Sequence, residues 1–107
     1  MIELVAEVPS YDFKVALETR KPKSWLKSVS SFANSIGGML FFGVSDDKRV
    51  VGLSDAQGDA EKISSLTKER ITPLPQFVLS AMKEDGKDVL SLKVSAGPAT
   101  PYYYRSD

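Results

Sequence analysis

Apolar residues recur along this chain with two different periods, and the change from one to the other divides it into strands and helices. Residues 11–17 alternate between apolar and polar and residues 39–44 are almost wholly apolar, which is typical of strands, the second of them covered on both faces. Residues 22–36 and 59–70 carry apolar side chains three and four positions apart, which indicates helices. Further strands are predicted at 49–53, 76–82 and 87–94, and a last one at 102–104. The predicted order is β-α-β-β-α-β-β followed by that last strand, an α+β fold with a mixed β-sheet and two helices.

Each predicted helix turns one apolar stripe toward the core. Pro22 suits the first position of the first helix, and Thr72-Pro73 ends the second. The stripe of the first helix makes core packing the main interpretation for Trp25, although a tryptophan can also stack on a nucleic-acid base. The two stripes consist of Trp25, Leu26, Val29, Phe32, Ala33 and Ile36, and of Ala60, Ile63, Leu66, Thr67 and Ile71.

The glycine pair Gly37-Gly38 stands between the first helix and the apolar strand. A phosphate-binding loop has its glycines after a strand and before a helix, so that amide groups at the positive end of the helix face the anion. Here the order is reversed, and neither GxGxxG nor GxxxxGK[ST] occurs in the chain. Gly37 is therefore predicted to end the helix in a left-handed conformation, with the strand following at once. Turns are predicted at Asp46-Asp47-Lys48 and at Asp85-Gly86.

Composition removes several classes of chemistry. The 107 residues are enough for one domain with an ordinary core, and 42% of them are hydrophobic. The chain has neither cysteine nor histidine, which excludes an ordinary zinc site, a Ser-His-Asp triad and a Cys-His nucleophile. A metal would have to be a hard cation held by carboxylates. No apolar run approaches the roughly 20 residues that span a bilayer, and we expect a cytoplasmic protein.

The charges balance in total, with fourteen acids and fourteen bases, but they are unevenly distributed. Between residues 14 and 27 five cations accompany a single acid, Glu18. One interpretation is a nucleic-acid interface, in which cations contact the phosphate backbone. The other is a solvated loop and helix face, since exposed charges are common. The candidate phosphate-binding residues are Arg20, Lys21, Lys23 and Lys27.

Several short motifs occur in a fixed order along the chain and together resemble one family. They are Asp12-Phe13-Lys14, Ser31-Phe32-Ala33-Asn34, Gly37-Gly38, Phe42-Gly43-Val44, Asp46-Asp47 and Val51-Gly52-Leu53. The pattern resembles the Schlafen-type AlbA-like domain, which is described as a DNA-binding domain of bacterial transcriptional regulators. Some members carry labels as divergent AAA ATPases or RecG-related helicases. The ATPase label has no counterpart here, because the chain has no phosphate loop.

This resemblance implies an AlbA-like fold and a DNA-binding role without catalysis or cofactor. It also implies that residues 1–107 form a single domain, the N-terminal part of a longer regulator whose further domains follow. The expected partner is therefore nucleic acid, contacted by the cations at positions 20–27.

Two alternatives stay open. Some Schlafen relatives are endoribonucleases with three carboxylates, and the matching positions here are Glu7, Asp12 and Asp46. In that case these residues would be both catalytic and metal-binding, with Mg²⁺ or Mn²⁺ activating water. The other alternative is a non-catalytic dimerisation module, in which an open edge of the sheet pairs with a second copy.

Overall fold

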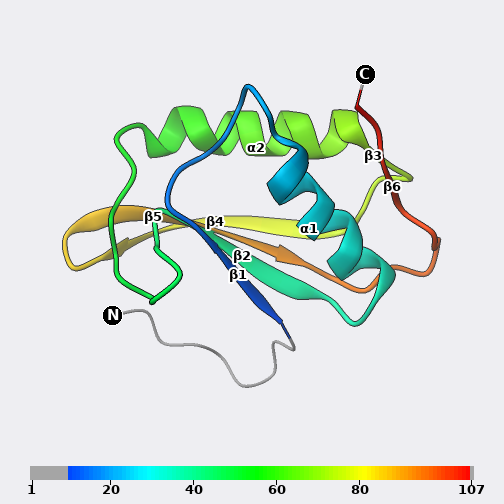
Figure 1. The fold of residues 1–107 in the computed structure, drawn as a ribbon, viewed down its shortest axis with the longest axis horizontal. Helices are drawn as coiled ribbons and strands as arrows, with labels where there is room; N and C mark the ends of the chain where they lie inside the picture. Colours follow the sequence, from blue (N-terminus) through cyan, green and yellow to red (C-terminus); the bar gives the residue numbers. More distant parts are fainter. Residues whose placement is uncertain (1–9, 107) are drawn as a thin grey trace.

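The fold consists of one four-stranded sheet with two helices on one of its faces (Figure 1). The computed structural model describes residues 10–106. The order along the chain is β1 (Tyr11–Lys14), α1 (Lys23–Asn34), β2 (Gly38–Phe42), α2 (Ala56–Arg70), β3 (Ile71–Thr72), β4 (Phe77–Glu84), β5 (Lys87–Val94) and β6 (Tyr103–Tyr104). The predicted α+β class with a mixed sheet and two helices is therefore confirmed.

The main sheet has the strand order β1-β2-β5-β4. β1 runs parallel to β2, whereas β2 with β5 and β5 with β4 are antiparallel pairs. A parallel pair needs a long crossover connection, which the loop after β1 and helix α1 provide. β3 and β6 form a separate antiparallel pair, in which Ile71 lies opposite Tyr104.

Alternation along the strands gives the sheet two different faces. The buried side chains on the helical face form the main core with α1 and α2, and they include Leu40, Phe42, Leu90 and Leu92. The opposite face carries a second cluster, in which the rings of Tyr11 and Phe13 each stack on Phe41 at centroid distances of 6.1 and 5.7 Å. The prediction that the apolar strand is buried on both faces is thus confirmed for β2.

The strand predicted at 49–53 was wrong. Among residues 10–106, the β pairing of this segment is limited to one isolated bridge, between Val44 and Val50. The chain instead bends around Gly43, whose carbonyl accepts the amides of Val51 and Gly52 at 2.8 and 2.9 Å. In a regular strand pair two adjacent amides do not donate to the same carbonyl, as those of Val51 and Gly52 do here. The segment is therefore a loop.

The prediction for Ile36 was also wrong. Helix α1 ends at Asn34, and Ile36 lies beyond it with 71% of its surface exposed. The helical spacing continues in the sequence, but the helix does not. Gly37 has the predicted left-handed conformation, φ +91°, and its amide donates to Phe32 O at 2.9 Å, which closes the helix end.

Asn34, the last residue of α1, holds the C-terminal segment against the helix. Its Nδ2 donates to Tyr102 O at 2.9 Å, and its Oδ1 accepts from Tyr102 N at 2.6 Å. The apolar stripe of the helix does not include Asn34, and the sequence gives no signal for this pair of bonds. Tyr102 itself is buried in the main core.

We expect Asn34→Ala to lower the free energy of unfolding by about 1–3 kcal/mol, because it leaves two backbone groups of Tyr102 without partners. Urea unfolding followed by tryptophan fluorescence measures this. Ser30→Ala is the control, since the Ser30 hydroxyl bonds only to Lys27 O, one turn back on the same helix. Equal losses in the two variants would show that the Asn34 bonds contribute nothing specific.

Candidate nucleic-acid interface

The candidate interface is the start of α1 together with the loop that precedes it. Buried residues fix this segment: Trp25 is 1% exposed and meets Phe42 edge to face, with ring centroids 5.6 Å apart. Its Nε1 donates to Glu18 O at 3.1 Å, which ties the loop to the helix. Trp25 is therefore a core residue, and its buried ring is not available to stack on a base.

The four predicted phosphate-binding residues all lie on the surface of this segment. Arg20 and Lys21 precede the helix, whereas Lys23 and Lys27 are four positions apart on one exposed face of α1. Within residues 10–106, none of the four takes part in an ion pair. These cations thus lie close together in the sequence on a fixed support, and no carboxylate of residues 10–106 is within ion-pair distance of them.

The N-terminus of α1 adds positive potential to the cations. Its N-cap is Pro22, which makes no side-chain capping bond, and its first turn contains no acid. The free amides and the helix dipole at this end favour an anion. The sequence signal for this feature is the run Lys-Pro-Lys, in which a proline flanked by two cations stands where a helix start usually has Ser, Thr, Asp or Asn.

The start of α2 has the opposite character. Asp55 caps the helix by accepting from Gly58 N at 3.1 Å, and Asp59 lies in the first turn. Burial and, second, the charge of Asp55 raise the pKa of Asp59. Two carboxylates therefore already occupy this helix end, which distinguishes it from that of α1 as a place for phosphate.

The side of α2 that adjoins the loop bounds the basic surface. A shallow groove there is lined by Thr19 of the loop and by helix residues whose charged members are Glu61, Lys62 and Glu69. Figure 1 shows the connection between β1 and α1 passing beside α2. Two carboxylates against one lysine give this groove a net negative charge, which disfavours a phosphate there.

A polar cluster joins β1 to α1 beside Lys23 and Lys27. Asp12 Oδ2 accepts from Ser28 Oγ at 2.9 Å and lies 3.6 Å from Lys14 Nζ, which donates to Ser24 Oγ at 3.1 Å. Asp12 Oδ1 accepts from Phe13 N. Both oxygens of Asp12 therefore have partners within the domain. The cluster was not predicted from the sequence, although Ser24 and Ser28, four positions apart on the helix, give a weak signal for it.

The three-carboxylate site stays a prediction. Glu7 lies outside the described residues, Asp12 belongs to the cluster with Ser28, and Asp46 is exposed in the turn after β2. Among residues 10–106 no group of three acids is close enough together to hold a metal ion. A Mg²⁺ or Mn²⁺ site would thus depend on where Glu7 lies.

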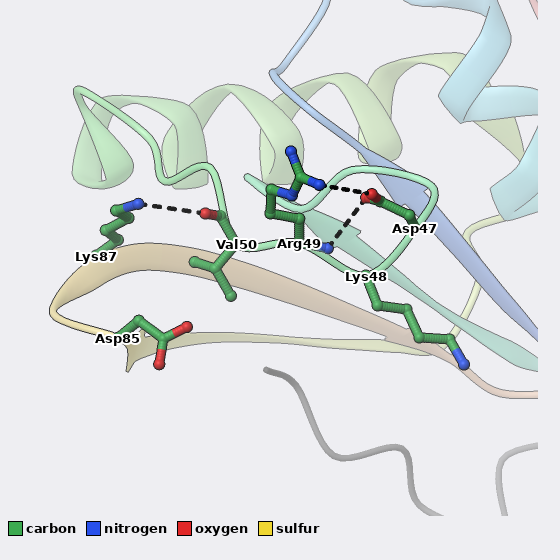
Figure 2. Close-up of a pocket in the computed structure, with 6 residues that line it drawn as sticks. All are labelled: Asp47, Lys48, Arg49, Val50, Asp85 and Lys87. Atoms are coloured by element: carbon green, nitrogen blue, oxygen red, sulfur yellow. Dashed lines mark hydrogen bonds and ion pairs between the residues drawn. The ribbon is translucent and has the colours of Figure 1, made fainter.

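A second hollow, of about 450 Å³, lies between the turn after β2 and the tip of the β4–β5 hairpin (Figure 2). Two of its cations already have partners there: Arg49 lies 3.4 Å from Asp47, and Lys87 Nζ donates to Val50 O at 3.4 Å. The Ser45 hydroxyl, which donates to Asp47, and the adjacent Arg49 hold the pKa of Asp47 below its usual value. These internal bonds make the hollow a weaker anion site than the start of α1.

Comparisons with known proteins agree with this architecture. The sequence pattern of the Schlafen, AlbA_2 family matches residues 7–107. The chain belongs to that family. The resemblance seen in the sequence is thereby confirmed, and the matched range covers every element of the fold.

Two solved structures are similar to this Schlafen, AlbA_2 domain. One is the N-terminal domain of a protein from Nitrosomonas europaea whose name relates it to the ATP-dependent DNA helicase RecG. It has a TM-score of 0.71 and 21% identity over 95% of this chain and 74% of that one, a likeness of fold. The other is the DIP2311 protein from Corynebacterium diphtheriae, with a TM-score of 0.65 and 26% identity. That match covers 98% of this chain but 21% of the other, so this chain spans about a fifth of its length.

The helices of the described part of the Schlafen, AlbA_2 domain, residues 10–106, include none that is long and apolar enough to cross a membrane.

Proposed function

We propose that this Schlafen, AlbA_2 domain binds nucleic acid by placing a phosphate group at the N-terminus of α1. The observation that carries the proposal is an uncapped helix start without acids, surrounded by Arg20, Lys21 and Lys23 and extended by Lys27. Membership of the family and the likeness to a RecG-related domain are consistent with a role at nucleic acids.

The arrangement is costly for the free domain, and this favours a binding role. Cations near the positive end of a helix are unfavourable by about 0.3–1 kcal/mol each when exposed. A bound phosphate would offset this unfavourable electrostatic free energy, because it interacts favourably with the helix amides and with the lysines at once. In a purely solvated surface there is no such compensation.

The proposal extends to the setting of the domain. We place it in the cytoplasm as the DNA-binding part of a longer transcriptional regulator, which is the role that the family resemblance implies. The contacts available at α1 are to the phosphate backbone, so the domain itself contributes affinity more than sequence discrimination.

The test compares Lys23→Gln/Lys27→Gln with the wild-type chain in titrations of short single- and double-stranded DNA and RNA at several salt concentrations. We expect the slope of log K against log salt to become shallower by about one unit for each lysine that contacts a phosphate. At low salt the affinity should fall by about tenfold or more. Including Mg²⁺ and Mn²⁺ and running the products on a gel detects cleavage in the same samples.

Lys68→Gln/Lys93→Gln is the matched control, since it changes the net charge equally at exposed positions on α2 and β5. Its affinity and salt slope should stay near those of the wild type. The Lys23→Gln/Lys27→Gln variant should also unfold at the same or a slightly higher temperature, because it removes cations from the wrong end of a helix. Equal losses of affinity in both double variants would overturn the proposed interface.

A further inference from the structure

Strand β4 (Phe77–Glu84) is the last strand in the order of the main sheet that residues 10–106 form. Its inner side forms a ladder with β5 over its whole length. No strand within residues 10–106 pairs with its outer side. The outer side therefore presents a row of backbone donors and acceptors, which is a template for another strand.

One hydrogen bond determines which residues of β4 present these groups. Ser95 N donates to Gln76 O at 3.0 Å, so this opposed pair is a hydrogen-bonded one. Hydrogen-bonded and non-hydrogen-bonded pairs alternate along an antiparallel ladder. The backbone groups of every second residue of β4 accordingly point away from β5. These outward-facing residues are Phe77, Leu79, Ala81 and Lys83.

The edge lacks most of the devices that block pairing. β4 contains no proline and no bulge, and its register with β5 is unbroken. Val78 is 62% exposed on the face away from the helices. The only cation of the strand, Lys83, is 3.0 Å from Asp88 of β5, so its charge is already compensated.

We propose that β4 pairs antiparallel with β4 of a second copy of this chain, with Ser80 at the two-fold axis. In this register Phe77 lies opposite Lys83 of the second copy, and Leu79 lies opposite Ala81. Every outward-facing backbone group of the strand then meets another one. A shift by two residues would place an outward-facing residue opposite Pro75 or Asp85, outside the strand.

The side chains fit the same register. On the helix-free face Val78 lies opposite Met82, which makes an apolar pair, and Ser80 lies opposite Ser80 with both hydroxyls able to bond. No like charges are opposed, since Glu84 lies opposite Gln76. This self-complementarity is the reason to assign the edge to a second copy of the chain rather than to an unrelated strand.

The resulting dimer is one continuous sheet with the order β1-β2-β5-β4-β4-β5-β2-β1. The axis is perpendicular to the sheet, so the helices of both copies cover the same face. This inference does not depend on the proposed nucleic-acid binding, because β4 is one edge of the main sheet and the start of α1 is bonded to β1 at the opposite edge.

The test measures the mass of the chain by sedimentation and light scattering from micromolar to millimolar concentration. We expect a concentration-dependent dimer. Ser80→Lys and Ser80→Glu each oppose like charges at the axis and should raise the dissociation constant by about tenfold or more. An equimolar mixture of the two should associate at least as well as the wild type. A wild-type chain that stays monomeric throughout, or a mixture no better than its components, would overturn the inference.

A crosslink tests the register itself, and the absence of native cysteine makes the experiment clean. Ser80→Cys places two thiols directly across a non-hydrogen-bonded pair, a distance that suits a disulfide. Mild oxidation should convert most of this variant to a linked dimer. Val78→Cys, on the same face but opposite Met82, should link at least about tenfold more slowly. Equal linking of the two variants would show that the copies do not meet in this register.

Discussion

Replacing Trp25 by alanine should lower the free energy of unfolding by about 3–5 kcal/mol. The ring is 1% exposed, packs edge to face on Phe42 and donates to Glu18 O at 3.1 Å. Truncation therefore leaves a cavity between α1 and β2 and also an unpaired carbonyl. For a domain of this size the melting temperature should fall by about 12–20 °C, measured by circular dichroism.

Two variants separate burial from the other properties of the ring. Trp25→Phe keeps most of the contact with Phe42 but loses the indole donor, and we expect a loss of about 1–2 kcal/mol. Ile36→Ala removes a large apolar side chain that is 71% exposed, and its effect should stay within about 0.5 kcal/mol. If Trp25→Ala cost no more than Ile36→Ala, Trp25 would not be the anchor of α1.

Trp25 also links the fold to the proposed function. The helix that it anchors carries Lys23 and Lys27, and its bond to Glu18 ties down the loop with Arg20 and Lys21. Trp25→Phe, which should remain folded at room temperature but loses the bond to Glu18, is therefore expected to weaken nucleic-acid binding only slightly, because Lys23 and Lys27 stay in place on the helix. A large loss of affinity in this folded variant would show that the indole contributes to binding by more than its support of the loop.

The parts of the fold that depend on local patterns could be predicted from the sequence. The stripe of α1 and the left-handed Gly37 follow from helical spacing and from the preference of helix ends for glycine. Ile36 shows the limit of such patterns, because periodicity does not say at which residue the helix stops. The strand predicted at 49–53 failed for a related reason: apolar residues there satisfy their amides by bending around Gly43.

The parts that depend on distant residues could not be predicted in this way. Asn34 and Tyr102 are 68 positions apart, and nothing near either residue in the sequence indicates that they bond. The small β3–β6 sheet, in which Ile71 lies opposite Tyr104, likewise joins residues that are distant in the sequence. Likewise, the position of β4 at the edge of the sheet follows from the order of the strands in space, which a single sequence does not specify.

In the candidate site, too, the local features could be predicted from the sequence and the contacts between distant residues could not. The cations at positions 20–27 are visible as a local excess of charge, and the uncapped helix start can be read from Lys-Pro-Lys. The cluster of Asp12 with Ser28 forms only because β1 lies beside α1 in the fold. The sequence therefore does not show that the Asp12 carboxylate has partners within the domain.

The second large effect is expected at the join between α1 and β2. Gly37→Ala should lower the free energy of unfolding by about 2–4 kcal/mol, for two reasons that act together. The residue has φ +91°, a conformation that side chains rarely adopt. An added Cβ would also lie 3.0 Å from Val94 O and 3.3 Å from Ala96 N, which are backbone atoms of β5 and of the segment after it and cannot rotate away.

Gly86→Ala separates these two reasons. Gly86 has φ +74° in the β4–β5 turn, but a Cβ there would have no atom within 4 Å. This variant therefore measures the conformational cost by itself, which we expect to be about 1 kcal/mol. The difference between the two variants, measured by urea unfolding, is the crowding of Gly37 against the backbone near Val94. Equal losses would mean that the backbone near Val94 shifts to accommodate the added Cβ. Gly37 would then be required for its positive φ and not for the close approach of the helix end to the sheet.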